Sequence, residues 1–418
     1  MFLNNLNNFY YSHQVGLFLK KKESAQLKQQ DNAMSGGKYA VNTGQAKDGG
    51  VALPDFSGLV RHRPKILAQQ VRSFVQESTL RGHKKAVYAC KFEPLYGDLL
   101  ATCSHDMSAI VWDIRNGQQV RTLKEHAGWV MDVAWTNDGN FLLTASADKT
   151  IMIWSTRKTF VWSAFAVLHT FSGHTDVVMG ITVSPDNTRM LSCSKDKTIK
   201  VWDLKRATQN LLWKEGNAAQ VYTIKGAPEN YDGHSDYIFK IVFSPDGQQF
   251  LTCSEDLTIK RWNAATGDML MNYTGHREPV LSVAWRYDMT FFASASHDKT
   301  VKMWDVENGR CASTLKGHKD IVYDVKFSGE CNKGRLLVSC GHDGRVIVWD
   351  TKKRLELVHY VGMHRGWVLS IDWSKDNYRL ATGAGDHKVI VWVAHARSCG
   401  ECCHECCFDC KRSCSLCC

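Results

Sequence analysis

The sequence predicts an all-β fold that stacks seven copies of one four-stranded unit, and two observations carry this prediction. A set of four residues, a His, a Ser or Thr, an Asp and a Trp six residues after the Asp, occurs seven times between Gly82 and Trp392. Successive Trp residues of the set lie 42, 48, 60, 42, 45 and 43 residues apart. A repeat of this length is one supersecondary unit that cannot bury its own faces, so the units must stack on one another.

No set lacks a member. In chain order the seven sets, called tetrads below, are His83/Thr102/Asp106/Trp112, His126/Thr144/Asp148/Trp154, His174/Ser192/Asp196/Trp202, His234/Thr252/Asp256/Trp262, His276/Ser294/Asp298/Trp304, His318/Ser339/Asp343/Trp349 and His364/Thr382/Asp386/Trp392.

Each unit contains strand patterns in a fixed order, which the second unit illustrates. One pattern, Val120 to Leu123, precedes the tetrad His; Val130 to Trp135 and Phe141 to Ser146 lie between His and Asp; another runs up to Trp154. In other units the connections read Ser-Pro-Asp-Asn (184 to 187) and Ser-Pro-Asp-Gly (244 to 247), which are turn sequences. Each unit therefore has four short strands.

Residues 82 to 393 resemble the WD-repeat β-propeller family. The likeness rests on two recurring pairs, Gly-His and Trp-Asp, found at Gly82-His83, Gly173-His174, Gly233-His234, Gly275-His276, Gly317-His318, Trp112-Asp113, Trp202-Asp203, Trp304-Asp305 and Trp349-Asp350. Departures are local and leave every tetrad intact: they are Glu125, Met363, Ser155, Asn263 and Val393. The resemblance implies a single seven-bladed propeller with four antiparallel strands per blade, whose edges are short and protected.

The resemblance also implies that the strand before the first Gly-His closes the ring by completing the last blade. Residues Ser73 to Leu80 occupy that position. We therefore divide the chain into a basic leader predicted to be disordered (1–72), the propeller (73–393) and a Cys-rich tail (394–418).

The donors and acceptors of a tetrad predict an internal clamp, in which indole, hydroxyl, imidazole and carboxylate form one hydrogen-bonded chain. The same His, Ser and Asp also resemble a hydrolase triad. One reaction centre does not need seven copies around a ring, and the sequence has no phosphate-binding Gly loop, His-Glu-x-x-His or nucleophile elbow. We predict a protein that is not an enzyme and needs no cofactor.

Composition predicts a cytoplasmic or nuclear protein. The 418 residues are 44% hydrophobic, no apolar run is long enough to span a bilayer, and the N-terminus lacks a secretory signal pattern. Of the net charge of +10, most lies in residues 1–72, which carry 10 basic and 4 acidic side chains. Those basic clusters could contact nucleic acid or an anionic membrane surface, but without interleaved aromatic residues a solvated segment is the simpler interpretation. The propeller gives no strong nucleic-acid signal. Met34 is an alternative start.

In WD-repeat proteins the partner often contacts the third and fifth residues after each tetrad His and the residue before each Asp. Transferred here, these positions are strongly apolar and aromatic; the partner-binding candidates are Tyr88, Trp129, Met131, Met179, Tyr237, Phe239, Leu281, Tyr323, Trp367 and Leu369, with His105, His297 and His342 on the Asp turns. The β-branched fourth residues, such as Val87, should point into the blades, so strand alternation turns their neighbours outward. The alternative is that these side chains fill the mouth of the central channel.

Two insertions are further candidates, because the 20 residues from Trp154 to His174 and the 32 from Trp202 to His234 exceed the usual 14. Aligning Val221 to Ile224 with Val120 to Leu123 places a strand inside the larger insertion, with excess residues on both sides of it. Surface loops also tolerate insertion without any function.

One further motif suggests a ubiquitin-ligase role. Trp112-Asp113-Ile114-Arg115 matches the Trp-Asp-x-Arg motif of substrate receptors of cullin-type ubiquitin ligases. It occurs once, and an Arg after Trp-Asp is also an ordinary turn residue. A ligase receptor therefore remains an alternative to a general scaffold for protein-protein interaction.

The tail suggests metal binding, because nine of the 16 cysteines lie in the last 20 residues. The candidate ligands have Cys-x-x-Cys spacing suited to tetrahedral zinc: Cys399, Cys402, Cys403, Cys406, Cys407, Cys410, Cys414 and Cys417. Lipid acylation and a segment introduced by splicing or a mistaken reading frame are the alternatives.

Overall fold

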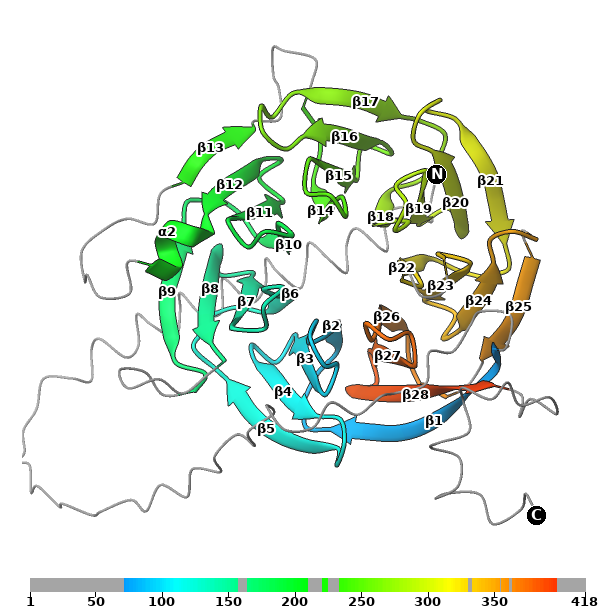
Figure 1. Ribbon diagram of the computed structural model, residues 1–418, viewed down its shortest axis with the longest axis horizontal. Coiled ribbons are helices and arrows are strands. Elements are labelled where there is room, and N and C mark those ends of the chain that lie inside the picture. Colours follow the sequence, from blue (N-terminus) through cyan, green and yellow to red (C-terminus); the bar gives the residue numbers. More distant parts are fainter. Residues whose placement is uncertain are drawn as a thin grey trace, which may run out of the picture. The chain divides into compact units, whose positions relative to one another are not determined.

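The structure, a computed structural model, describes residues 71–156, 164–209, 220–224, 233–329, 333–353, 355–360 and 363–396. Within these residues it confirms the seven-bladed propeller: seven antiparallel sheets of four strands are arranged in a ring around a central axis, and we call the region along this axis the channel (Figure 1). We number the blades 1 to 7 in chain order, so that blade 1 consists of β2 to β5 and blade 7 of β26 to β28 with β1.

The strands of a blade follow one another from the channel outward. The innermost strands are β2 (Val87–Phe92), β6 (Val130–Trp135), β10 (Val178–Val183), β14 (Ile238–Phe243), β18 (Val280–Trp285), β22 (Val322–Phe327) and β26 (Val368–Trp373). The second strands are β3 (Leu99–Ser104), β7 (Phe141–Ser146), β11 (Arg189–Ser194), β15 (Gln249–Ser254), β19 (Phe291–Ser296), β23 (Leu336–Gly341) and β27 (Arg379–Ala384).

The third strands carry the tetrad Trp. They are β4 (Ala109–Asp113), β8 (Thr150–Ser155), β12 (Ile199–Asp203), β16 (Ile259–Asn263), β20 (Thr300–Asp305), β24 (Val346–Asp350) and β28 (Lys388–Ala396). The outer strands are β5 (Gln118–Leu123), β9 (Val167–Ser172), β13 (Gln220–Ile224), β17 (Met269–Tyr273), β21 (Cys311–Lys316), β25 (Leu355–Tyr360) and β1 (Val71–Arg81).

The ring closes as the sequence predicts. Strand β1 pairs antiparallel with β28, so the first described strand of the chain is the outer strand of the last blade. Phe74 and Leu80 on β1 are buried, and Glu77 accepts two hydrogen bonds from the Arg379 guanidinium at 2.6 and 2.7 Å. Apolar contact and an ion pair therefore both fasten β1 to blade 7.

The core lies between neighbouring blades. Six described clusters of buried side chains each join two adjacent blades; one, for example, unites Leu143 and Ile153 of blade 2 with Val178 and Trp202 of blade 3. Second strands such as β7 are covered on both faces, and all residues after the first are buried. This explains why these strands read as continuous runs of apolar and small residues without polar alternation.

The predicted strand inside the larger insertion is confirmed, since β13 pairs with β12 and Ile224 lies opposite Ile199. A short helix that the sequence did not predict, α2 (Leu204–Gln209), directly follows β12. The smaller insertion rejoins the described residues before β9. The rest of both insertions, at 157–163, 210–219 and 225–232, lies outside the described residues.

Candidate partner-binding face

Every tetrad forms one continuous chain of hydrogen bonds. In blade 4 the indole Nε1 of Trp262 donates to Thr252 Oγ1 at 2.8 Å, and Thr252 Oγ1 lies 2.7 Å from His234 Nε2. His234 Nδ1 lies 2.8 Å from Asp256 Oδ2. An indole N–H only donates and a carboxylate only accepts, so the hydroxyl donates to Nε2 and Nδ1–H donates to the Asp. The other six blades repeat this arrangement.

The hydroxyl that would act as a nucleophile in a hydrolase is sealed from solvent. Each tetrad Ser or Thr, Thr252 among them, has an exposed fraction of 0%. Burial lowers the pKa of His234 despite Asp256, and hydrogen bonds from His234 and Thr258 outweigh burial to hold the pKa of Asp256 well below its usual value. In blade 4 a neutral His234 therefore lies on an ionised Asp256. Because every tetrad hydroxyl is closed to a substrate, the tetrads are structural clamps.

The sequence reasoning missed a fifth member of this network. Thr258, two residues after Asp256, donates its hydroxyl to Asp256 Oδ1 at 2.6 Å, and its backbone N–H donates to the same oxygen. The backbone N–H of Ser235 donates to Asp256 Oδ2. The missed signal was a Ser or Thr two residues after the tetrad Asp, present at Ser108, Thr150, Thr198, Thr258 and Thr300.

A backbone hydrogen bond in every blade brings two of the three predicted contact positions together. In blade 1 the N–H of His105, the residue before the tetrad Asp, donates to the carbonyl of Ala86, the third residue after the tetrad His. The corresponding bonds join Ala147 to Trp129, Lys195 to Val177, Glu255 to Tyr237, His297 to Pro279, His342 to Ile321 and Gly385 to Trp367. We call this end of the propeller the His-loop face.

The third contact position, the fifth residue after each His, lies in a β-bulge. The pairing between the innermost and second strands skips Tyr88, passing from Val87 opposite Ser104 to Ala89 opposite Cys103, and the same irregularity occurs in all seven blades. A bulge bends the strand and redirects the extra side chain. Strict alternation therefore does not describe the strand at this point, although the β-branched residue before the bulge is fully buried as predicted.

The candidates differ in exposure. Trp367 and Tyr237 are exposed, at 48% and 38%. The others are half-buried: Tyr88, Trp129, Met131, Met179, Phe239, Leu281, Tyr323 and Leu369. Met179 and Phe239 pack partly against the core clusters of blades 3, 4 and 5. Of the ten partner-binding candidates, eight are thus half-buried, and the rings of Trp367 and Tyr237 project into solvent.

Three of the aromatic rings lie at boundaries between blades, each against the residue before the Asp of the preceding blade. The centroids of Trp129 and His105 are 4.0 Å apart in an edge contact, and Trp367 stacks on His342 with centroids 4.5 Å apart. At the third boundary the ammonium of Lys195 lies 5.3 Å from the centroid of Tyr237. These contacts hold each ring between two rigid blades.

The histidines on the Asp turns differ in their surroundings. Burial, and then Lys85, lowers the pKa of His105 to about 4, so His105 is neutral at physiological pH. Burial also lowers the pKa of His297, against the opposing effect of Glu278. His342 Nδ1 lies 2.8 Å from the hydroxyl of Tyr323. His105 and His342 therefore serve as packing partners of aromatic rings.

Comparison with known proteins agrees with this geometry. The family described as "WD domain, G-beta repeat" matches seven segments, 74–113, 117–155, 165–203, 228–263, 267–305, 309–350 and 355–393. The chain belongs to the WD-repeat family. Its propellers are typically non-catalytic scaffolds that bind proteins or peptides, and the family match indicates no catalytic family.

Curated relatives match over short stretches only. The chain is 42% identical over 83 residues to nuclear distribution protein PAC1 of Arthroderma otae and 31% identical over 83 residues to coronin-7 of Mus musculus. It is 43% identical over 61 residues to ribosome assembly protein 4 of Chaetomium thermophilum. These matches cover 18%, 20% and 15% of this chain and 18%, 9% and 12% of the relatives. The chain thus spans less than a fifth of each relative's length.

The candidate ligase motif is engaged within its own blade of this WD-repeat protein. Trp112 is buried and donates to Thr102, while the Arg115 guanidinium binds Asp113 through two bonds of 2.9 and 2.5 Å. Burial raises the pKa of Asp113, but the opposing effect of Arg115 is larger, so the pKa of this carboxyl lies below its usual value. Because Asp113 already holds the guanidinium fork, the structure gives the ligase hypothesis no separate support.

The metal hypothesis lies beyond the described residues, since all of the candidate Cys ligands follow position 396. Across the described ranges, no group of three or more His, Cys, Asp and Glu side chains is arranged to hold a metal ion. Among the same residues, none of the helices has the length and apolar character needed to cross a membrane.

Proposed function

We propose that this WD-repeat protein is a non-catalytic scaffold that binds proteins or peptides on the His-loop face. The observation that carries the proposal is the set of aromatic rings held at blade boundaries, of which Trp367 and Tyr237 project into solvent. Tryptophan and tyrosine side chains are typical anchors of protein interfaces.

Rigidity of these rings supports the same function. Trp367 stacks on His342, which in turn lies beside Tyr323. The neighbouring blade therefore restricts the indole ring of Trp367 in the free protein. A side chain that is already ordered loses little conformational freedom on binding. Binding through these aromatic side chains should therefore cost little conformational entropy.

Charged residues on the His-loop face should contribute more to the choice of partner than to the affinity for it. Lys197 lies 3.5 Å from Asp236 and Lys299 lies 3.6 Å from Asp320, and all four side chains are at least 41% exposed. Exposed ion pairs of this kind add little stability, but they steer encounters and discriminate between partners. We propose that the aromatic rings anchor the partner and that these pairs select it, in the cytoplasm or nucleus.

Affinity capture from the organism's own extract tests the proposal. Trp367→Ala and Tyr237→Ala are compared with Tyr96→Ala, which removes an aromatic ring of 51% exposure from the loop between β2 and β3 at the opposite end of the propeller. We expect the first two variants to lose specifically captured proteins that Tyr96→Ala retains, with melting temperatures unchanged. Equal recovery by all three variants moves the binding surface elsewhere.

A further inference from the structure

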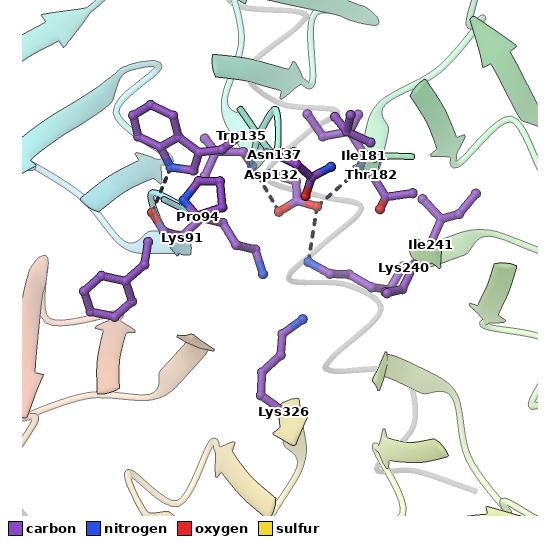
Figure 2. Close-up of a pocket in the computed structure, with 15 residues that line it drawn as sticks. Lys91, Pro94, Asp132, Trp135, Asn137, Ile181, Thr182, Lys240, Ile241 and Lys326 are labelled. Carbon is purple, nitrogen blue, oxygen red and sulfur yellow. Dashed lines mark hydrogen bonds and ion pairs between the residues drawn. The ribbon is translucent and has the colours of Figure 1, made fainter. Parts of the chain in front are cut away.

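The channel end opposite the His-loop face is lined by lysines. Each innermost strand begins at the His-loop face, so its last residues lie at the far end of the channel. Lys91 on β2 and Lys326 on β22 are the last but one residues of their strands, and Lys240 lies in the middle of β14. Figure 2 shows the three amino groups extending into the same space. They line one cavity of about 230 Å³.

Two of the three lysines have a carboxylate partner. Lys240 Nζ lies 3.2 Å from Asp132 Oδ2, and Lys91 Nζ lies 3.6 Å from Asp372 Oδ1. Lys326 forms neither a hydrogen bond nor an ion pair with any residue in the described ranges. Lys326 is therefore the one lysine of this group without a hydrogen bond or ion pair among the described residues, although Asp324 and Asp372 act on it electrostatically.

The carboxylate nearest in sequence, Asp324, is occupied elsewhere. Its Oδ1 accepts from the hydroxyl of Ser282 at 2.6 Å and from the N–H of Val325 at 2.9 Å. Its Oδ2 accepts from the hydroxyl of Ser370 at 3.3 Å and the N–H of Ile371 at 3.1 Å. Asp324 thus joins blades 5, 6 and 7 and has no hydrogen bond to Lys326.

Lys326 also lines a second cavity, of about 380 Å³, between blades 6 and 7. Its walls include Asp372, Trp373, Lys375 and Asn377. Two buried donors in this wall have no acceptor among the described residues, the indole Nε1 of Trp373 and the amide Nδ2 of Asn377. A buried donor without an acceptor is costly and uncommon in native proteins, so two in one cavity require an explanation.

The corresponding tryptophans of other blades show that the unpaired indole is particular to blade 7. Trp135 closes β6 and donates to the carbonyl of Lys91 in the preceding blade at 3.0 Å. Trp285 closes β18 and donates to the carbonyl of Val242 in the preceding blade at 3.3 Å. Trp373 closes β26 in the same position without such a bond. The wall of this cavity therefore contains two residues with an unpaired N–H, together with the side chain of Lys326, which lines both cavities.

The electrostatics of Lys326 agree with this arrangement. Burial, and then Lys91, lowers the pKa of Lys326 to about 8. Lys240 lowers it further by a smaller amount, whereas Asp324 and Asp372 act in the opposite direction. Most of the ammonium is charged at pH 7. A bound anion would offset the repulsion from the other two lysines and raise this pKa.

We propose that the cavity between blades 6 and 7 binds a small oxoanion of the phosphate class. The Lys326 ammonium supplies the charge, and the Trp373 and Asn377 N–H groups supply neutral donors. Oxoanions accept several hydrogen bonds at once and so match a site made of donors. The one carboxylate in the wall, Asp372, is balanced by Lys91 and accepts from the N–H of Phe92 at 2.9 Å.

Calorimetric titration of the full chain with inorganic phosphate and with sulfate tests the proposal. We expect saturable binding of both, weakened roughly tenfold or more in Lys326→Gln because an ionic hydrogen bond is lost, and retained in Lys326→Arg. Sulfate keeps its charge over the range used, so its binding should weaken as the pH rises above 8. Absence of saturable binding, or equal binding by Lys326→Gln, overturns the site.

A pair of Trp→Phe variants gives a matched control that does not depend on charge. Trp373→Phe removes an unpaired N–H, so it should weaken anion binding while leaving the ligand-free melting temperature almost unchanged. Trp285→Phe removes an N–H that bonds Val242, so it should lower the melting temperature and leave anion affinity unchanged. The reverse pattern, or equal affinities in both variants, contradicts a role for the Trp373 indole.

Discussion

Replacement of Asp386 by Asn should destabilise the propeller at neutral pH, and by roughly half as much at pH 3. The Asp386 carboxylate accepts from His364 Nδ1 at 3.1 Å and from the backbone N–H groups of Arg365 and Lys388 at 3.0 and 3.2 Å. Burial raises its pKa, but these bonds outweigh burial and lower the pKa from 3.8 to about 2. The folded state thus favours the ionised form.

The magnitude follows from proton linkage. A drop of that size corresponds to about 2.5 kcal/mol of stability at pH 7, since each pH unit is worth about 1.4 kcal/mol. Because the folded-state pKa is depressed, this contribution is complete above the unfolded pKa and is lost as the pH falls toward the folded value. By pH 3 it should be roughly half as large. Solvent screens this partly exposed carboxylate, and the Asn oxygen can still accept one hydrogen bond, so 2.5 kcal/mol is an upper value.

Equilibrium urea unfolding, followed by tryptophan fluorescence at several pH values, measures this effect. Asp268→Asn, in an exposed turn, is the control and should change stability by less than about 0.5 kcal/mol. A loss for Asp386→Asn that is the same at pH 7 and pH 3, or that stays within the range of the control, would refute the linkage argument.

Three further perturbations test the closing strand, the clamp and the tail. Phe74→Ala removes a buried ring of β1 and should lower the free energy of unfolding by about 3–5 kcal/mol, whereas Val75→Ala, at an exposed position, should lower it by less than about 0.5 kcal/mol. Equal losses in urea unfolding would contradict the closing role of β1. An unchanged melting temperature after deletion of residues 73–81 would contradict it as well. Trp304→Phe leaves the Ser294 hydroxyl without its donor and should cost about 1–3 kcal/mol by the same measurement, so no loss would show the bond to be dispensable. Elemental analysis of the intact chain and of a chain lacking residues 394–418 tests zinc in the tail, and equal zinc content would reject it.

The blade architecture could be predicted because each unit carries its own signals. Two predicted strands, Val130 to Trp135 and Phe141 to Ser146, coincide with β6 and β7 at both ends. Their boundaries are set locally, by the tetrad His before them and by the turn between them. The closing strand was also predictable, since a seventh blade with three strands needs one more, although β1 begins at Val71, before the predicted start.

The details of the binding face could not be predicted because they depend on contacts between blades. Alternation from Val87 turns Tyr88 outward, but the bulge leaves Tyr88 half-buried beside His105. Lys195 and Tyr237 lie more than 40 residues apart and meet only because blades 3 and 4 are neighbours. Nor does the sequence distinguish Trp373 from Trp135 and Trp285, whose strand positions are equivalent. Only the structure shows that the indole N–H of Trp373 has no acceptor among the described residues, whereas those of Trp135 and Trp285 have one.

The central claim is that partners bind the His-loop face, and photo-crosslinking tests it most directly. A photoreactive phenylalanine analogue is placed at Trp367 in one chain and at Tyr96, on the opposite end, in another; the two side chains are similarly exposed, at 48% and 51%. We predict protein adducts from position 367 that are absent from position 96. Adducts of equal yield from both positions, or from position 96 alone, would contradict the claim.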